Sequence, residues 1–114
     1  DGYNYKVFPD GSRYEGQWKD GKRHGVGTQV LDQDTSYVGR WENGMQHGSG
    51  KYIDHHSGTE YEGHWLCGAH HGTGILRSKN GEREKLQYCH GSLSSREVLP
   101  RPTQFLPLNA LLGQ

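Results

Sequence analysis

The chain has 114 residues, of which 18 are glycine and only 30% are hydrophobic, so it can form one domain but not a thick globular core. Its formal net charge is zero, with 13 basic and 13 acidic residues, which excludes a global electrostatic attraction to nucleic acid. It has no run of 18 apolar residues and no signal-peptide pattern, and its two cysteines are too few for a disulfide scaffold, so we expect a cytoplasmic protein.

Residues 1–13 resemble the second half of a repeat. Gly2 lies 23 residues before Gly25, which is the spacing between the repeats that follow. We therefore expect the chain to open halfway through an earlier repeat and to be part of a longer array.

Three copies of one pattern come next, beginning at Tyr14, Tyr37 and Tyr61, 23 and then 24 residues apart. A fixed period in this range predicts a repeat array, in which each unit needs its neighbours to bury an apolar face. Aromatic residues recur in register within the copies, which argues against disorder in spite of the polar composition.

Each copy predicts a β-hairpin, because Asp20-Gly21 and Asn43-Gly44 favour two-residue type I′ turns. Closing the first hairpin at Asp20-Gly21 sets Gly16 opposite Gly25 and places the tyrosine, tryptophan and glycines of the copy on one face. Paired glycines would leave a trough in which aromatic rings lie against the backbone. The glycines expected in this structural role are Gly16, Gly25, Gly27, Gly39, Gly48, Gly50, Gly63, Gly72 and Gly74.

The C-terminal part departs from the pattern. Residues 84–91 keep the spacing, but Leu86 and Tyr88 replace the glycine and the tryptophan, so we expect a degenerate terminal cap. Residues 92–114 are rich in serine, proline and leucine, and we expect a linker and tail, extended over residues 92–103. The predicted fold is therefore all-β: an elongated single-layer antiparallel meander of hairpins over residues 1–91, followed by a Pro/Leu-rich tail.

The pattern Tyr-Glu-Gly-x-Trp-x-x-Gly-Lys-x-His-Gly-x-Gly resembles the MORN repeat family, named for membrane occupation and recognition nexus. Residues 14–27 match it at nearly every position, whereas Val38, Ala69-His70 and most of the fourth copy depart from it. The resemblance implies a curved single-layer sheet without catalytic residues. It also implies binding to partner proteins, to further MORN chains or to acidic phospholipids, at cytoskeletal, ciliary, flagellar or membrane-proximal sites.

The aromatic stripe is the first candidate site. In a sheet one layer thick nothing obvious covers its rings, and exposed aromatic area of that size usually marks an interface. Two interpretations stay open: the rings serve only as the core, or they also form a groove for a peptide segment or another MORN chain. The stripe consists of Tyr14, Trp18, Tyr37, Trp41, Tyr61 and Trp65.

The tail is the second candidate, because its apolar side chains need cover. We hypothesise that it docks in an aromatic groove of the same chain or of a neighbour, which would make the array self-associate. A disordered end is the alternative. The side chains involved would be Phe105, Leu106, Leu108, Leu111 and Leu112.

We expect no cofactor and no metal. The one set of residues that could offer three zinc ligands is Glu62, His64 and His71, if the third hairpin sets the two histidines opposite each other. Five basic side chains could contact the head groups of acidic phospholipids, and acidic residues are interleaved with them along the sequence. These cations are Lys19, Lys22, Arg23, Arg40 and Lys51.

The sequence does not indicate catalysis, because no nucleophile elbow, phosphate loop or triad-like Cys/His pair is present. We therefore expect a non-enzymatic protein–protein interaction scaffold that binds a protein or peptide and no nucleic acid. A membrane-proximal module for acidic phospholipids and a regulatory appendage of an upstream enzyme are the alternatives.

Overall fold

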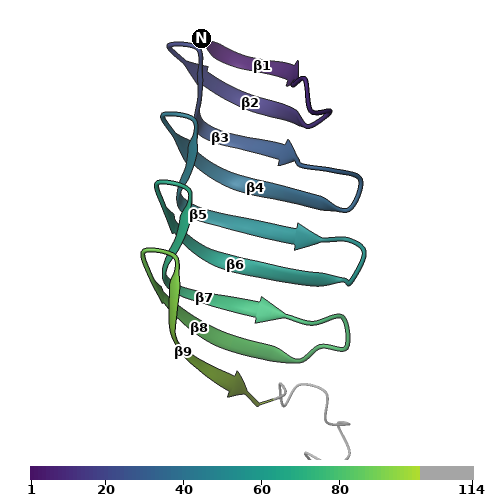
Figure 1. The fold of residues 1–114 in the computed structure, drawn as a ribbon, viewed down its shortest axis with the longest axis vertical. Helices are drawn as coiled ribbons and strands as arrows, with labels where there is room; N and C mark the ends of the chain where they lie inside the picture. The colour runs from purple at the N-terminus through teal and green to yellow at the C-terminus, as the bar shows by residue number, and fades with distance from the viewer. Residues whose placement is uncertain (101–114) are drawn as a thin grey trace, which may run out of the picture.

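The computed structural model describes residues 1–100, which form one open sheet of nine strands (Figure 1). Each strand pairs antiparallel with the next in the chain, so the sheet is a meander without crossovers. The predicted all-β hairpin array is therefore confirmed, and residues 1–100 contain no helix. The strands are β1 (Gly2–Val7), β2 (Arg13–Lys19), β3 (Lys22–Val30), β4 (Thr35–Glu42), β5 (Met45–Asp54), β6 (Thr59–Leu66), β7 (Ala69–Arg77), β8 (Arg83–Cys89) and β9 (Ser92–Leu99).

The sheet is a single curved layer in which the strands lie one below another from β1 to β9 (Figure 1). Tight turns join the strands along one side of this column, and longer loops join them along the other. No second layer covers either face within the described residues. No other layer of the described structure therefore blocks the access of a partner to either face.

The tight turns have positive φ at both central residues, as type I′ turns require. The prediction is confirmed at Asp20-Gly21, with φ of 52° and 74°, and at Asn43-Gly44, with φ of 51° and 83°. Cys67-Gly68 and His90-Gly91 adopt the same conformation, although neither cysteine nor histidine is typical of it. A backbone hydrogen bond ties each later turn to the hairpin before it, as where Gly44 N donates to Arg23 O at 3.0 Å.

The register within the hairpins differs from the expected one. Trp18 pairs with Arg23 as the turn requires, but Gly16 then pairs with Gly27 and not with Gly25. The β3 strand thus holds two extra residues at a bulge, and β5 and β7 show the same shift. Because side chains alternate between faces with a period of two, a two-residue shift leaves every side chain on its expected face.

The two glycines of the Gly-x-Gly pattern have different tasks. Gly25 lies at the bulge with a φ of 66°, where a β-carbon would also overlap the Gln17 side chain. The Gln17 Oε1 atom occupies this space and accepts a hydrogen bond from Val26 N at 2.8 Å. Gly27 has ordinary backbone geometry, but a β-carbon there would overlap the Tyr14 ring. The first glycine is therefore needed for conformation and the second for ring packing.

The fourth hairpin corrects the expected start of the linker. Residues 92–99 are not an extended linker, because they form β9 and pair with β8. Residues 84–91 are accordingly the first strand and turn of a full hairpin, in which Leu86, 4% exposed, lies opposite Gly74 and fills the place of the missing glycine. The predicted tail contacts of Phe105, Leu106, Leu108, Leu111 and Leu112 lie outside the described residues.

Candidate binding face

The aromatic stripe forms the core of the sheet. Tyr14 and Tyr37 are completely buried, and Trp41, Tyr61 and Trp65 are 3 to 6% exposed. Tyr14 and Tyr37 each pack edge-to-face against two tryptophans, one from their own hairpin and one from the next, whereas Tyr61 packs against Trp65 and Tyr88. The expectation that nothing covers these rings is wrong, because the rings of successive hairpins cover one another. Their role in partner binding stays a prediction.

The spacing of the contacts shows how one hairpin holds the next. The Tyr14 ring centroid lies 5.1 Å from that of Trp18 and 5.4 Å from that of Trp41, with interplanar angles of 81° and 88°. Such T-shaped pairs stabilise by about 0.5–1.5 kcal/mol beyond the area that they bury. The core is therefore continuous along the array.

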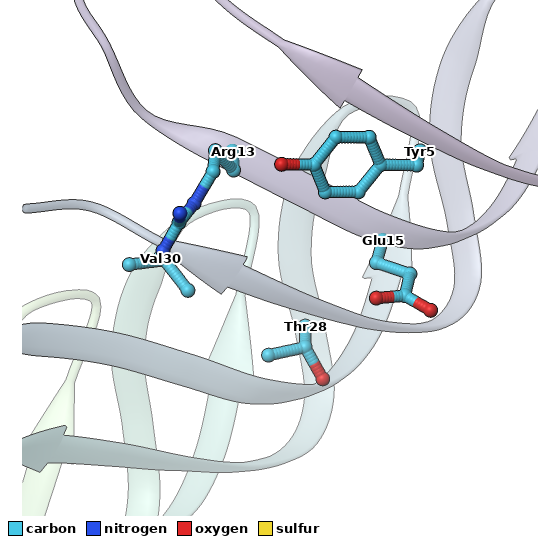
Figure 2. A pocket seen from close by; sticks show the side chains of 5 residues that line it. All are labelled: Tyr5, Arg13, Glu15, Thr28 and Val30. Carbon is cyan, nitrogen blue, oxygen red and sulfur yellow. The ribbon is translucent and has the colours of Figure 1, made fainter.

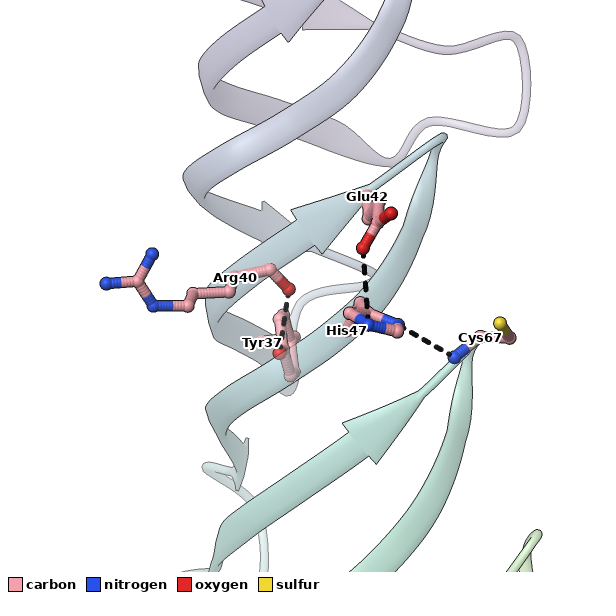
Figure 3. A network of polar contacts seen from close by, with 5 residues as sticks. All are labelled: Tyr37, Arg40, Glu42, His47 and Cys67. Atoms are coloured by element: carbon pink, nitrogen blue, oxygen red, sulfur yellow. Dashed lines mark hydrogen bonds and ion pairs between the residues drawn. The ribbon is translucent and has the colours of Figure 1, made fainter.

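Hydrogen bonds anchor the polar ends of these rings in the first two hairpins. The Tyr14 hydroxyl donates to Gln17 O at 2.9 Å, and the Tyr37 hydroxyl donates to Arg40 O at 3.2 Å (Figure 3). Burial raises the pKa of Tyr37 to about 12. In the third hairpin the buried Tyr61 hydroxyl and the Trp65 indole N–H have no hydrogen-bond partner among residues 1–100.

Half-buried side chains form the accessible layer above this core, on the same face, which we call the aromatic face. A partner would touch this layer rather than the buried rings. Sequence reasoning identified Trp18 in it but missed the rest, although Arg23 and His70 lie directly opposite tryptophans in the hairpins. The layer consists of Phe8, Trp18, Arg23, Gln46, Tyr52, His70, Leu76 and Tyr88.

The C-terminal half of the aromatic face is built around His70. Its ring lies 4.1 Å from the Trp65 ring and 4.6 Å from the Tyr88 ring, nearly parallel to the latter at 24°. Burial lowers the pKa of His70, since a charged imidazole loses hydration there. The ring therefore packs as a neutral aromatic group.

The opposite face carries exposed apolar side chains and several shallow hollows, one of which lies near its N-terminal end. This hollow has a volume of about 200 Å³, below the roughly 300–1,000 Å³ of typical ligand pockets. Figure 2 shows its lining, in which the Tyr5 ring and Val30 lie beside Arg13, Glu15 and Thr28. The hollow is therefore too small and open for a small-molecule site. The exposed apolar side chains near it are Tyr3, Tyr5, Val7, Val26 and Val38.

The repeated histidines hold neighbouring turns together. His47 Nδ1 accepts a hydrogen bond from Cys67 N at 3.4 Å, and its Nε2 lies 3.2 Å from a Glu42 carboxylate oxygen (Figure 3). His71 Nδ1 likewise accepts from His90 N at 3.3 Å. These histidine side chains therefore link the hairpin of one repeat to the turn of the next.

The three possible zinc ligands are not brought together. The bulge between Gly63 and Trp65 removes His64 from the pairing with β7, and Glu62 forms an ion pair with Arg77 at 3.3 Å. Within residues 1–100 no three potential metal ligands form a group. The expectation that β-hairpin pairing sets His64 opposite His71 is wrong.

The five candidate lipid-binding cations also lie apart. Arg23 lies on the aromatic face over the Trp41 ring, whereas Arg40 and Lys51 lie on the opposite face. Lys51 is paired with Glu60 at 3.4 Å. The two remaining cations, Lys19 and Lys22, lie beside the first tight turn next to Asp20 and Glu42. They form no single basic surface.

A curved single layer of hairpins, with an interlocked aromatic core and one aromatic face, shows that the chain is a β-hairpin repeat array. The MORN repeat family model matches residues 14–32, 37–54 and 61–83, together more than half of the chain, and the chain belongs to this family. The matched segments begin at the three predicted repeat starts. Repeats of this family typically bind proteins or membranes.

A comparison with curated proteins finds no match to the chain. Among the described residues, no helix is long and apolar enough to cross a membrane.

Proposed function

We propose that the chain is a non-enzymatic scaffold that binds a peptide segment of a partner protein along its aromatic face. One observation carries the proposal: half-buried aromatic and apolar side chains line one face of a sheet, and no other described element covers that face. Tryptophan and tyrosine rings of this kind are enriched among the residues that dominate binding energy.

The aromatic face suits a peptide because it is already formed. Its accessible rings pack on a core whose residues are almost completely buried, so few side-chain rotamers remain to be ordered on binding. An extended segment or one side of a helix could lie across successive hairpins. A second copy of the chain is the alternative protein partner.

Acidic phospholipid is the weaker candidate. The cations that would contact head groups are divided between the two faces and the turn edge, and one of them is paired with a glutamate. A location at a cytoskeletal, ciliary, flagellar or membrane-proximal structure stays a prediction.

Selection from a library of random peptides of about 12 residues tests the proposal without knowledge of the partner. We expect enriched peptides that bind the wild-type chain and lose binding to Tyr52→Glu, which places a charge on the aromatic face. Val38→Glu is the matched control, because Val38 lies on the opposite face and is 41% exposed. Peptides that bind both variants equally, or no enriched peptide at all, would contradict the proposal.

A further inference from the structure

Two cationic side chains, Lys6 and Arg23, lie near the Phe8 ring at the N-terminal end of the aromatic face. The Lys6 Nζ atom lies 5.2 Å from the centroid of the Phe8 ring, and the Arg23 Cζ atom lies 5.5 Å from the same centroid. Each also faces a tryptophan: Lys6 lies 5.9 Å from Trp18 and Arg23 lies 4.7 Å from Trp41. All four distances are within the cation–π range of about 6 Å.

Neither cation has a carboxylate partner within the described part of the chain. The ion pairs there involve His47, Lys51, Arg77 and Arg96. Lys6 is exposed, whereas Arg23 is half-buried. Desolvation lowers the pKa of Arg23, because the charged guanidinium loses hydration there. A bound anion would offset this loss.

The Arg23 side chain is held in place before any ligand arrives. Its Nη1 donates to Gln29 Oε1 at 3.0 Å, and its Nη2 donates to Gly44 O at 2.7 Å. Gln29 is only 7% exposed, so its amide is a fixed support. A guanidinium has five N–H groups, and the remaining ones stay available to a ligand. Preorganisation of this kind lowers the entropic cost of binding.

We propose that this group of side chains, the cation–aromatic cluster of Lys6, Phe8, Trp18 and Arg23, binds an acidic side chain of the partner peptide. The inference rests on the proposed function and specifies the chemistry of the partner. An aspartate or glutamate accepts hydrogen bonds from Arg23 and lies near the Lys6 ammonium group. An adjacent apolar side chain of the peptide packs on the Phe8 and Trp18 rings.

The composition of the chain's own tail excludes it as the source of such a side chain. Residues 101–114 contain Arg101 and no aspartate or glutamate. A flat anionic bilayer also fits poorly, because the guanidinium of Arg23 is half-buried between rings rather than projecting from a basic surface. The cluster is therefore assigned to an acidic segment of the partner peptide rather than to residues 101–114 or a membrane surface.

The same peptide selection, repeated on the intact chain with charge variants, tests the assignment. We expect aspartate or glutamate next to an aromatic or leucine residue in the enriched peptides. Lys6→Gln and Arg23→Gln should each weaken binding of such a peptide about tenfold or more, and added NaCl should weaken binding to the wild type. Arg23→Lys keeps the charge but not the planar fork, so its effect should be smaller.

Arg40→Gln is the matched control, because it removes an exposed arginine from the opposite face, and its affinity should equal that of the wild type. Lys6 is exposed, so Lys6→Gln should keep the wild-type thermal midpoint and thereby separate lost binding from lost folding. Unchanged affinity in both Lys6→Gln and Arg23→Gln, or equal weakening in Arg40→Gln, would overturn the assignment.

The outcomes also separate this inference from the function on which it rests. The enriched peptides could lack acidic residues, lose binding to Tyr52→Glu and keep binding to Lys6→Gln. This result would overturn the acidic-partner assignment but would still support peptide binding by the aromatic face. Failure to enrich any peptide would overturn both. Binding to phosphatidylserine vesicles that weakens in Lys6→Gln, in the absence of peptide binding, would assign the cluster to lipid instead.

Discussion

The tyrosine hydroxyls of the core provide a matched pair of substitutions at one repeat position. Tyr14 is completely buried and its hydroxyl donates to Gln17 O at 2.9 Å, whereas the buried hydroxyl of Tyr61 has no partner in the described part of the chain. Both tyrosines pack edge-to-face against the tryptophan of their own hairpin, and the ring from the next hairpin is Trp41 for Tyr14 and Tyr88 for Tyr61. Replacing each tyrosine by phenylalanine removes the same atom, so the hydrogen bond is the main difference between the two variants.

The two substitutions should change stability in opposite directions. Tyr14→Phe loses a buried hydrogen bond and should lower the free energy of unfolding by about 0.5–1.5 kcal/mol. Tyr61→Phe removes an unsatisfied buried hydroxyl, whose desolvation costs about 1–3 kcal/mol, and should leave stability unchanged or raise it. Since a change of 1 kcal/mol shifts the midpoint of a 60–100-residue domain by roughly 4–8 °C, the difference is measurable.

Urea denaturation followed by tryptophan fluorescence is the suitable assay, because two of the three tryptophans lie in the core. Tyr5→Phe is the control, since Tyr5 is 54% exposed and should change the free energy of unfolding by less than about 0.5 kcal/mol. If Tyr61→Phe destabilised the chain as much as Tyr14→Phe, the Tyr61 hydroxyl would have a partner, such as a buried water, and the argument would fail.

Three further predictions concern packing, pH and the C-terminal tail. Gly27→Ala should displace the Tyr14 ring and lower the free energy of unfolding by about 2–4 kcal/mol. The control Val26→Ala changes an exposed side chain and should lower it by less than about 0.5 kcal/mol. An equal effect of both variants would refute the packing argument. Because burial lowers the pKa of His70, its contribution to stability is full above the ordinary pKa of about 6.5 and is lost as the pH falls from that value through the lowered pKa of the folded protein. Thermal midpoints should therefore fall less on acidification in His70→Gln than in the wild type, and parallel curves would contradict this. Truncation after residue 100 keeps β9 whole, so an altered solution mass or thermal midpoint would support tail docking and an unchanged one would refute it.

Much of the fold follows from the repeat pattern. The period of 23 to 24 residues, the turn dipeptides and the alternation of Tyr, Gly and Trp predict the hairpins and the face that their rings occupy. The bulge could not be predicted, because Gly25 and Gly27 lie two residues apart on the same face, so Gly16 can pair with either without moving a side chain to the other side. Only the positive φ of Gly25, which the sequence does not reveal, distinguishes the two registers.

The β9 strand was missed for a different reason. Its side chains are exposed except that of Leu99, so it has none of the apolar alternation that indicates a half-buried strand. The β9 strand is held by backbone hydrogen bonds to β8, and such bonds cannot be recognised from the amino-acid composition of a segment. The accessible layer of the candidate site was missed because Arg23, Tyr52 and His70 occupy positions that the repeat motif does not specify, although the turn already sets Arg23 opposite Trp18.

The nearest-neighbour character of the meander has a consequence for how the array loses structure. Within the described residues each strand pairs only with the strands before and after it, and ring contacts such as that of Tyr14 with Trp41 reach the next hairpin. Such a chain behaves as a one-dimensional series of coupled units, which folds quickly for a β protein and melts inward from its ends. Hydrogen exchange should therefore be slowest around β4 to β6 and fastest at β1 and β9, so the binding properties of the central hairpins can outlast those of the terminal ones.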